Sequence, residues 1–331
     1  MKKNNYTPSI DDIFISTVSR NTIEAANKFS KKHKRNVVLI ASLNQISTYE
    51  KSYLYNSFDE LNKKKISFNN KNLFIGRDHF GINSIKNFKI LNKNKFLTKN
   101  IKIDLLNNLD FIHFDMANDI NYMKSFNKII PLILKLNKKI IIEIGLDLDG
   151  SRTSNSTFIK LKDLQLKYSA NIKFITFQTG TKLFNNSNKG KVDYKNIRNN
   201  LLANDIKIYF KEHNSDFKNK NHFIKLKKYN FTFNIGPEFA YYENKHFMNK
   251  IKKIVKKENL NKFYSYVLSK KLWKKWCLTK LSNNDKLLSS LHYFYNGTYY
   301  LDLKEQLDEK IEFDKEVINQ DIKLLENKFI F

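Results

Sequence analysis

Histidine and carboxylate side chains stand at the ends of several short apolar runs in this sequence. Asp78 and His79 follow the run "LFIG", Glu143 lies within "KIIIEIG", and His213 ends "IKIYFKEH". Two imidazoles and one carboxylate form an N/N/O ligand set that leaves one coordination position open, as a catalytic zinc site requires. If the ends of these runs meet, the sequence predicts a divalent metal, zinc in our expectation, held by His79, Glu143 and His213. The alternative is that each histidine only caps a strand or forms an ordinary hydrogen bond.

Polar residues that could hold a phosphorylated substrate follow the later apolar runs. The segments "QTGT" and "NIGPE" offer exposed backbone N–H groups, and Thr179, Thr181 and Ser215 add hydroxyl donors. Five of the eight glycines lie at the ends of such runs, where the backbone must turn sharply or approach a ligand closely. The substrate-binding residues expected at these ends are Gln178, Thr179, Gly180, Thr181, Asn214, Ser215, Asn234, Gly236 and Glu238.

Eight short β-branched and aromatic runs recur through most of the chain. Most are almost continuously apolar, which is typical of parallel strands buried on both faces. Polar stretches with helical periodicity separate them, for example 21–34, 125–139 and 191–205. This alternation predicts a (β/α)8 TIM barrel, with a doubly wound open sheet as the alternative. The expected strands are 14–18, 37–42, 73–78, 111–115, 139–145, 172–180, 206–213 and 231–236.

The last part of the chain has no comparable series of strands. Its amphipathic stretches predict helices, so we expect a catalytic barrel domain at 1–245 and a helical C-terminal extension at 246–331 packed on it. Within the extension, "SKKLWKKWCLTK" (269–280) mixes basic and aromatic residues, as a surface that stacks nucleic-acid bases does. Helical spacing of the apolar residues in and just after this segment favours core packing over nucleic-acid binding. These residues are Leu272, Trp273, Trp276 and Leu281.

The composition sets limits on partners and compartment. The net charge is +28, but the lysines are spread along the whole chain among asparagines, which is typical of a solvated surface. Such a surface would still favour anionic substrates. A single cysteine, Cys277, excludes an internal disulfide and fits a reducing compartment. The N-terminus lacks the apolar region of a secretory signal, and no run is long enough to span a bilayer, so we expect a cytoplasmic location.

Several of these segments together resemble the Z-type subunits of tagatose-1,6-bisphosphate aldolase, barrel proteins related to the metal-dependent class II aldolases. The resemblance covers roughly residues 14–245, and more faintly "LWKKW" (272–276). No single motif is specific, but their order is. The motifs are "STVSRN", "LIASLNQIS", "GRDHFGIN", "FIHFDMA", "IEIG", "FQTGTKLF", "EHNSD" and "NIGPEFAYYE".

The resemblance implies roles for particular residues. His79 would bind the metal and Asp78 would serve as the proton donor, while His213 would be a second metal ligand. Glu143 matches an acidic residue of the family, Gln178 matches a glutamine, and the pair Asn44 and Gln45 matches an Asn-Gln pair that faces the barrel mouth.

Two positions depart from the family pattern. Arg77 replaces a small residue before the Asp-His pair and would suit a second anionic group on the substrate, or an ordinary ion pair. Lys211 stands where the family usually has an acid.

The resulting hypothesis is a metal-dependent aldolase that cleaves and forms a phosphorylated ketose through a metal-stabilised enediolate. Asp78 would transfer the proton, and Asp115 would assist it or orient a ligand. Two other hypotheses remain open: a non-catalytic partner subunit of a separate aldolase, and a metal-dependent sugar-phosphate epimerase that uses the same residues. The expected partners are a phosphorylated sugar and either further copies of the chain or an aldolase subunit. The other histidines are expected in interior, packing or surface positions: His33, His113, His222, His246 and His292.

Overall fold

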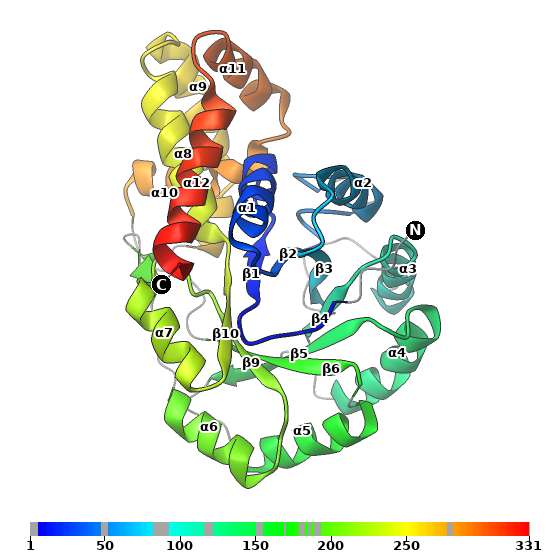
Figure 1. Cartoon of the computed structure of the whole chain (residues 1–331). Coiled ribbons are helices and arrows are strands. Elements are labelled where there is room, and N and C mark those ends of the chain that lie inside the picture. The colour runs from blue at the N-terminus through cyan, green and yellow to red at the C-terminus, as the bar shows by residue number, and fades with distance from the viewer. Residues whose placement is uncertain are drawn as a thin grey trace.

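The computed structural model describes residues 6–47, 52–81, 93–115, 122–149, 155–168, 170–178, 183–184, 187–188, 193–276 and 281–330. Eight parallel strands close into a barrel in the order β1-β10-β9-β6-β5-β4-β3-β2, which confirms the predicted (β/α)8 fold (Figure 1). A separate pair of two-residue strands, β7 (Leu183–Phe184) and β8 (Ser187–Asn188), is antiparallel. The barrel strands are β1 (Ile13–Ser16), β2 (Val37–Ala41), β3 (Leu73–Phe80), β4 (Phe111–Asp115), β5 (Ile141–Asp149), β6 (Ile172–Gln178), β9 (Tyr209–His213) and β10 (Phe231–Ile235).

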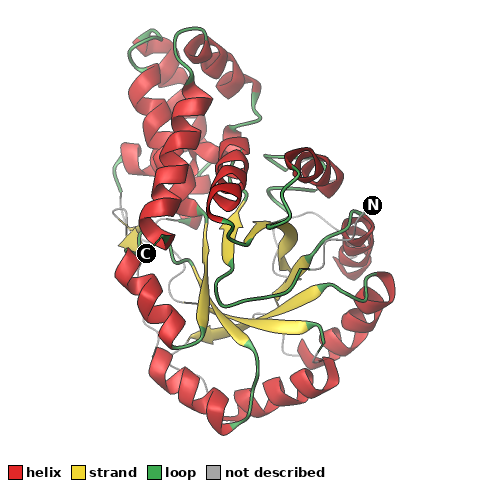
Figure 2. Ribbon diagram, in the orientation of Figure 1, coloured by secondary structure: helices red, strands yellow, loops and turns green. Residues whose placement is uncertain are grey.

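Helices follow the strands and surround the barrel (Figure 2). The predicted helices at 21–34, 125–139 and 191–205 correspond to α1, α4 and α6, each within a few residues. Helix α1 begins where the Ser19 side chain accepts a hydrogen bond from the backbone N–H of Thr22, an N-cap that satisfies an otherwise unpaired donor. The helices around the barrel are α1 (Arg20–His33), α2 (Phe58–Phe68), α3 (Lys93–Leu106), α4 (Tyr122–Leu136), α5 (Asn155–Tyr168), α6 (Tyr194–Ala203) and α7 (Lys220–Lys228).

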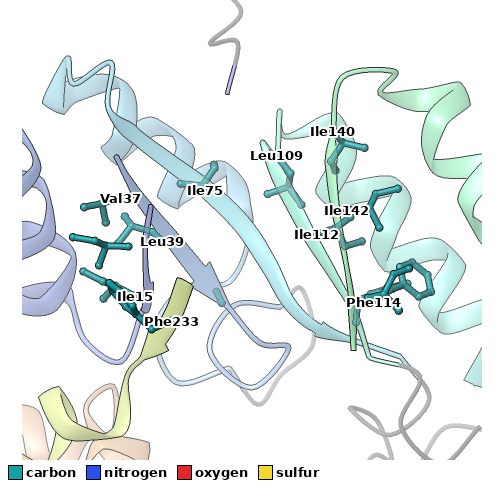
Figure 3. Close-up of a cluster of buried hydrophobic side chains, with 14 of the residues drawn as sticks. Ile15, Val37, Leu39, Ile75, Leu109, Ile112, Phe114, Ile140, Ile142 and Phe233 are labelled. Carbon is teal, nitrogen blue, oxygen red and sulfur yellow. The ribbon is translucent and has the colours of Figure 1, made fainter. Parts of the chain in front are cut away.

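Alternate residues of each strand point to opposite faces, so the barrel has two apolar layers. One layer fills the interior and includes Phe14, Phe111 and Phe174, whose ring centroids lie 5.1–6.0 Å apart. The other lies between strands and helices, where Figure 3 shows side chains such as Leu39 and Ile112. Burial on both faces explains why the strands appear in the sequence as continuous apolar runs.

The C-terminal segment forms helices, as the sequence predicts, and they stand together beside α1 (Figure 1). They enclose a second apolar cluster that includes Phe247, Phe263 and Phe313. The last helix returns to the barrel, where the Phe329 ring stacks on Phe233 of β10 at 4.6 Å. The elements are α8 (Pro237–Ile251), α9 (Lys257–Ser269), η2 (Leu272–Lys275), α10 (Asn283–Ser290), η3 (Leu291–Phe294), α11 (Thr298–Asp308) and α12 (Phe313–Phe329).

The predicted domain boundary at residue 245 lies inside α8, which continues from the end of β10 into the second apolar cluster. The division into two domains therefore stays a prediction. In the part of the chain that the structure describes, none of the helices has both the length and the apolarity that crossing a bilayer requires.

A buried acid couples the extension to the barrel helices. Glu243 of α8 is 2% exposed and accepts a hydrogen bond from Asn21 of α1 at 2.9 Å. Burial raises the pKa of Glu243 to about 7, and its hydrogen bonds offset only part of that effect. Burial and the neighbouring Glu243 also raise the pKa of Asp321, on α12, well above its usual range.

We expect the protein to lose stability as the pH rises from about 4.5 to about 7. The pKa of Glu243 in the folded state lies above its usual value of 4.5. Its contribution to the free energy of unfolding is therefore fully present below pH 4.5 and is lost as the pH rises to about 7, where the buried carboxyl ionises. Glu243→Gln should remove this component and be about 3 kcal/mol more stable than the parent at pH 8. Urea unfolding at pH 5 and pH 8 measures it, with the exposed Glu305→Gln as control. Equal losses in parent and Glu243→Gln would contradict the assignment.

Candidate active site

A bulge in β3 explains how two consecutive residues can serve one site. Neighbouring residues of a regular strand point to opposite faces, but the pairing of β3 with β4 shifts between Arg77 and Phe80. Within the bulge, His79 takes a positive φ of 49°. As a result Asp78 and His79 both line one cavity at the C-terminal ends of the barrel strands.

The two glycines that flank this pair are required by close approach of β4. A Cβ on Gly76 would lie 2.7 Å from the Phe111 ring, and a Cβ on Gly81 would lie 1.9 Å from the backbone oxygen of Asp115. Both distances are shorter than van der Waals contact. The glycines therefore let β3 lie close enough to β4 for Asp78 and His79 to reach their partners.

The imidazoles of His79 and His213 meet in the cavity. Their Nε2 atoms are 3.0 Å apart, although the residues are 134 positions apart in sequence. Nδ1 of His79 donates to Oδ2 of Asp115 at 3.0 Å, which leaves Nε2 directed at His213. Two nitrogens bound to one tetrahedral zinc ion would be about 3.4 Å apart, so the observed spacing is close to that of a shared ion.

Asp78 is held between two histidines. Its Oδ1 accepts from Nδ1 of His113 at 2.7 Å, and its Oδ2 lies 3.6 Å from Nε2 of His79. Donor atoms of Asp78, His79 and His113 all lie within 4.8 Å of one another, a grouping that could hold a metal ion. His113 is 1% exposed and hydrogen-bonded, as expected for an interior histidine.

Burial and neighbouring charges shift the pKa values of Asp78, His79 and His213 in different directions. Burial raises the pKa of Asp78, but His79 and His113 outweigh it, and the net pKa is well below the usual range. Burial lowers the pKa of His79, but Asp78 and Asp115 outweigh it, and the net pKa is raised. Burial and the charge of His79 lower the pKa of His213 well below its usual value. These opposite shifts favour a proton on His79 over one on His213, and a cation could take the place of that proton.

Glu143 lies at the edge of this group, with its Oε1 3.7 Å from Nε2 of His113. It is fully buried inside the barrel, where Oε2 lies 2.6 Å from Nζ of Lys211, and it does not line the cavity. The ammonium of Lys211 also lies over the rings of Phe14 and Phe111, at 4.7 and 5.4 Å. Because Lys211 already neutralises this carboxylate, the structure does not support the expectation that Glu143 is the third metal ligand.

Arg77 lies on the other side of β3. Phe74 and Asp78, which are an even number of residues apart, face the barrel interior, so Arg77 faces out toward the helices, where it is fully buried. Its guanidinium makes a bidentate ion pair with Asp104 of α3, at 2.7 and 3.0 Å, and donates to the backbone oxygen of Ile46 at 2.8 Å. This position corrects the expectation that Arg77 binds an anionic group of the substrate.

The cavity has a volume of about 220 Å³, small beside the roughly 300–1,000 Å³ of drug-sized sites. Of the predicted substrate-binding residues, Asn44, Gln45, Asn214, Asn234 and Gly236 lie in its wall. The Gln45 amide is held by Ser16 and by the backbone oxygen of Thr17.

Two predicted substrate-binding residues lie behind the cavity wall, which corrects their assignment. The hydroxyl of Ser215 donates to Glu212 at 2.5 Å. The carboxylate of Glu238 accepts from the backbone N–H of Phe217 and pairs with Lys328. Thr179, Gly180 and Thr181 lie outside the described residues, and for Gln178 the structure describes only the backbone, at the end of β6.

A group of cavity residues from the C-terminal extension was not predicted from the sequence. Trp276 and His292 line the cavity, although we expected the first in a hydrophobic core and gave the second no part in the site. No residue of η2 (Leu272–Lys275) is buried, and Leu272 is 42% exposed, so the core-packing expectation for this segment was wrong. The one available signal was the pair of lysines flanked by two tryptophans in "LWKKW". The missed cavity residues of the extension are Lys275, Trp276, His292 and Tyr293.

Asp216 is a further missed residue. It lines the cavity, and its Oδ1 accepts from the backbone N–H groups of Gly236 and Glu238 at 2.9 and 2.8 Å. Burial and the nearby Glu238 raise its pKa to about 7. In sequence it stands three residues after His213, in a segment already recognised as the end of a strand.

Asp115→Asn should weaken metal binding by about 10–100-fold while leaving the fold intact, because the Asp115 carboxylate orients the His79 ring. Zinc titration against a competing chelator measures this change. The matched control is Asp163→Asn on α5, away from the cavity. An unchanged zinc affinity for Asp115→Asn would show that this hydrogen bond does not position His79.

Comparisons with known proteins agree with this fold. No protein-family model matches the chain, and no curated protein sequence matches it. A crystal structure of a probable tagatose 6 phosphate kinase from Sinorhizobium meliloti 1021 superposes with a TM-score of 0.71 and 15% identity, over 96% of this chain and 93% of that one.

Two further structures are similar. The fructuronate-tagaturonate epimerase UxaE from Cohnella laeviribosi, with glycerol bound, superposes with a TM-score of 0.58 and 11% identity, over 95% of this chain and 80% of that one. A fructose-bisphosphate aldolase from Campylobacter jejuni has a TM-score of 0.56 and 13% identity, over 96% and 90%. At these identities the similarities establish a shared barrel fold, and membership of the Z-type subunit family stays a prediction.

Proposed function

We propose that this chain is a metal-dependent enzyme that reversibly cleaves a phosphorylated ketose by aldol chemistry. The observation that carries the proposal is the pair of imidazole Nε2 atoms of His79 and His213, 3.0 Å apart beside the Asp78 carboxylate in one cavity. Aldolase and epimerase structures share the barrel, which makes sugar chemistry a reasonable expectation for a site at its strand ends.

The donor set fits a divalent metal, zinc in our proposal. His79 and His213 would hold the ion through Nε2, because Nδ1 of His79 is engaged with Asp115. A bound ion would polarise the ketose carbonyl and stabilise the negative charge that develops as the carbon–carbon bond breaks.

The protein's own groups would orient the substrate and move the proton. Oδ1 of Asp78 is held by His113, so Oδ2 is positioned to take the proton of a substrate hydroxyl and return it in the reverse reaction. Oδ1 of Asn234 and Oδ2 of Asp216 are buried oxygens that accept no hydrogen bond among the described residues. Both residues line the cavity and would bind substrate hydroxyls.

An epimerase is the second candidate, favoured by the similarity to UxaE. Cleavage followed by re-addition on the other face of the carbonyl would use the same residues. A non-catalytic subunit is the third, although a scaffold has no need for two imidazoles and a carboxylate that converge in a cavity.

The test is an assay of the purified chain alone, loaded with zinc and given a panel of ketose bisphosphates and monophosphates. Release of a triose phosphate, followed by NMR, would support the aldolase, and a new epimer without cleavage would support the epimerase. Activity only after a partner aldolase is added, with a complex in size-exclusion chromatography, would support the subunit role and overturn our proposal.

A further inference from the structure

One side of the cavity is built by the C-terminal extension. Lys275, at the end of η2, the adjacent Trp276, and Tyr293 of η3 line the same cavity as His79 and His213. The barrel strands end by Ile235, so a segment about 40 residues later in the chain returns to cover the strand ends. The barrel strands therefore supply the histidines of the cavity, and the extension supplies one side of its wall.

Aromatic contacts fix this wall in place. Nε1 of Trp276 donates to the hydroxyl of Tyr293 at 2.8 Å. The Tyr293 ring makes an edge contact with Tyr53, from the loop after β2, at 5.3 Å between centroids. The ammonium of Lys275 lies 5.1 Å from the ring centroid of Trp276 and 5.9 Å from that of Tyr293. Cation–π contact with aromatic rings stabilises the position of an ammonium group and leaves its three hydrogen-bond donors free to bind a ligand.

Among the described residues that line the cavity, Lys275 is the only lysine or arginine. Lys211 is paired with Glu143 inside the barrel, and Arg77 is paired with Asp104 outside it. Within the part of the chain that the structure describes, no carboxylate lies at ion-pair distance from the Lys275 ammonium. The residue is exposed overall, so a ligand can reach it from solvent.

The neighbouring histidine adds no competing charge. Burial, followed by the charge of Lys275, lowers the pKa of His292 to about 3, so this ring is neutral at physiological pH. Protein atoms around the Lys275 ammonium lower its pKa, and the negative charge of Asp78 opposes that effect. A cation with reduced hydration at a cavity wall is a favourable site for an anion.

We propose that Lys275 is the specificity-determining residue of this site, which binds the anionic terminal group of an open-chain sugar whose carbonyl end lies at His79 and His213. The anion would be a phosphate or a carboxylate, which share the same recognition chemistry. The placement of the sugar carbonyl at His79 and His213 rests on the proposed function, whereas recognition of the anionic group by Lys275 does not.

The test compares binding of dihydroxyacetone phosphate, glycerate, inorganic phosphate and neutral dihydroxyacetone to the zinc-loaded full chain. Calorimetry measures affinity, and quenching of tryptophan fluorescence, to which Trp273 and Trp276 both contribute, reports occupancy of this wall. Lys275→Met should weaken binding of the preferred anionic probe by roughly 10–100-fold and leave dihydroxyacetone unchanged. Lys275→Arg should restore most of the affinity. Lys274→Met, which removes the neighbouring exposed lysine, is the matched control and should bind as the parent does.

The outcomes separate the two proposals. Tighter binding of dihydroxyacetone phosphate than of glycerate would identify phosphate as the anion, and the reverse would identify carboxylate. Equal affinity of the parent and Lys275→Met for every anionic probe, or no saturable binding of any anionic probe to the parent, would overturn the role of Lys275. If zinc is not retained but anion binding still depends on Lys275, the proposed function fails and this inference stands.

Discussion

Replacing either His79 or His213 by alanine should abolish stoichiometric zinc binding. Each imidazole supplies one Nε2 atom to the same small space, so removal of either leaves a single nitrogen and neighbouring carboxylate oxygens. The proposed site relies on two imidazole ligands, so loss of one nitrogen should release the ion under dialysis. Activity should fall by at least about 100–1,000-fold, because the electrostatic stabilisation of the transition state is lost.

Elemental analysis after dialysis measures zinc content, and the rate of cleavage measures activity. His246→Ala is a suitable control, because His246 pairs with Glu316 on the outside of the extension. Melting temperatures would show that the variants are folded. Full zinc content in both His79→Ala and His213→Ala would remove the metal site, and with it the proposed function.

The second large effect concerns the ion pair inside the barrel. Glu143→Gln or Lys211→Met should each destabilise the protein by about 3–5 kcal/mol, because each leaves one charged group buried without its partner. The double variant Glu143→Leu, Lys211→Met should recover most of that loss, since it removes both charges and keeps apolar volume. The surrounding rings of Phe14 and Phe111 favour an apolar replacement.

Urea unfolding of the parent, Glu143→Leu, Lys211→Met and the double variant forms a complete thermodynamic cycle, and Glu143→Gln is measured beside it. Zinc content of Glu143→Gln also tests the position of Glu143 relative to the metal. We expect that variant to keep its zinc, because the carboxylate lies with Lys211 and does not line the cavity. Additive losses of stability would show that the two charges do not interact. Loss of zinc with unchanged stability would restore Glu143 as a ligand.

The position of Arg77 shows what the local sequence pattern could predict about the direction of a side chain. Asp78 faces the barrel interior, so the two-residue period of a strand alone would have placed Arg77 outward, although it could not have identified Asp104 as its partner. The neighbouring His79 is different, because it lines the same cavity as Asp78 through a bulge and a positive φ. Nothing in a single sequence reports such a bulge, since it depends on how β3 pairs with β4.

The barrel itself could be inferred from the order of residues. Strands buried on both faces must be continuously apolar, and helices with a polar face must connect parallel strands. Both features can therefore be recognised in short segments of the sequence. The same reasoning placed Asp78, His79 and His213 at strand ends, on one rim. Their convergence to a 3.0 Å contact depended on closure of the barrel.

Folding in three dimensions decided the partners of the remaining groups. Glu143 faces Lys211 across the barrel interior, and Lys275 reaches the cavity only because the extension folds back over the strand ends. Charge and aromatic character are visible in the sequence, but distances between segments far apart in the chain are set by packing of the whole molecule. For that reason the sequence located the metal-binding histidines of the proposal and missed the lysine opposite them.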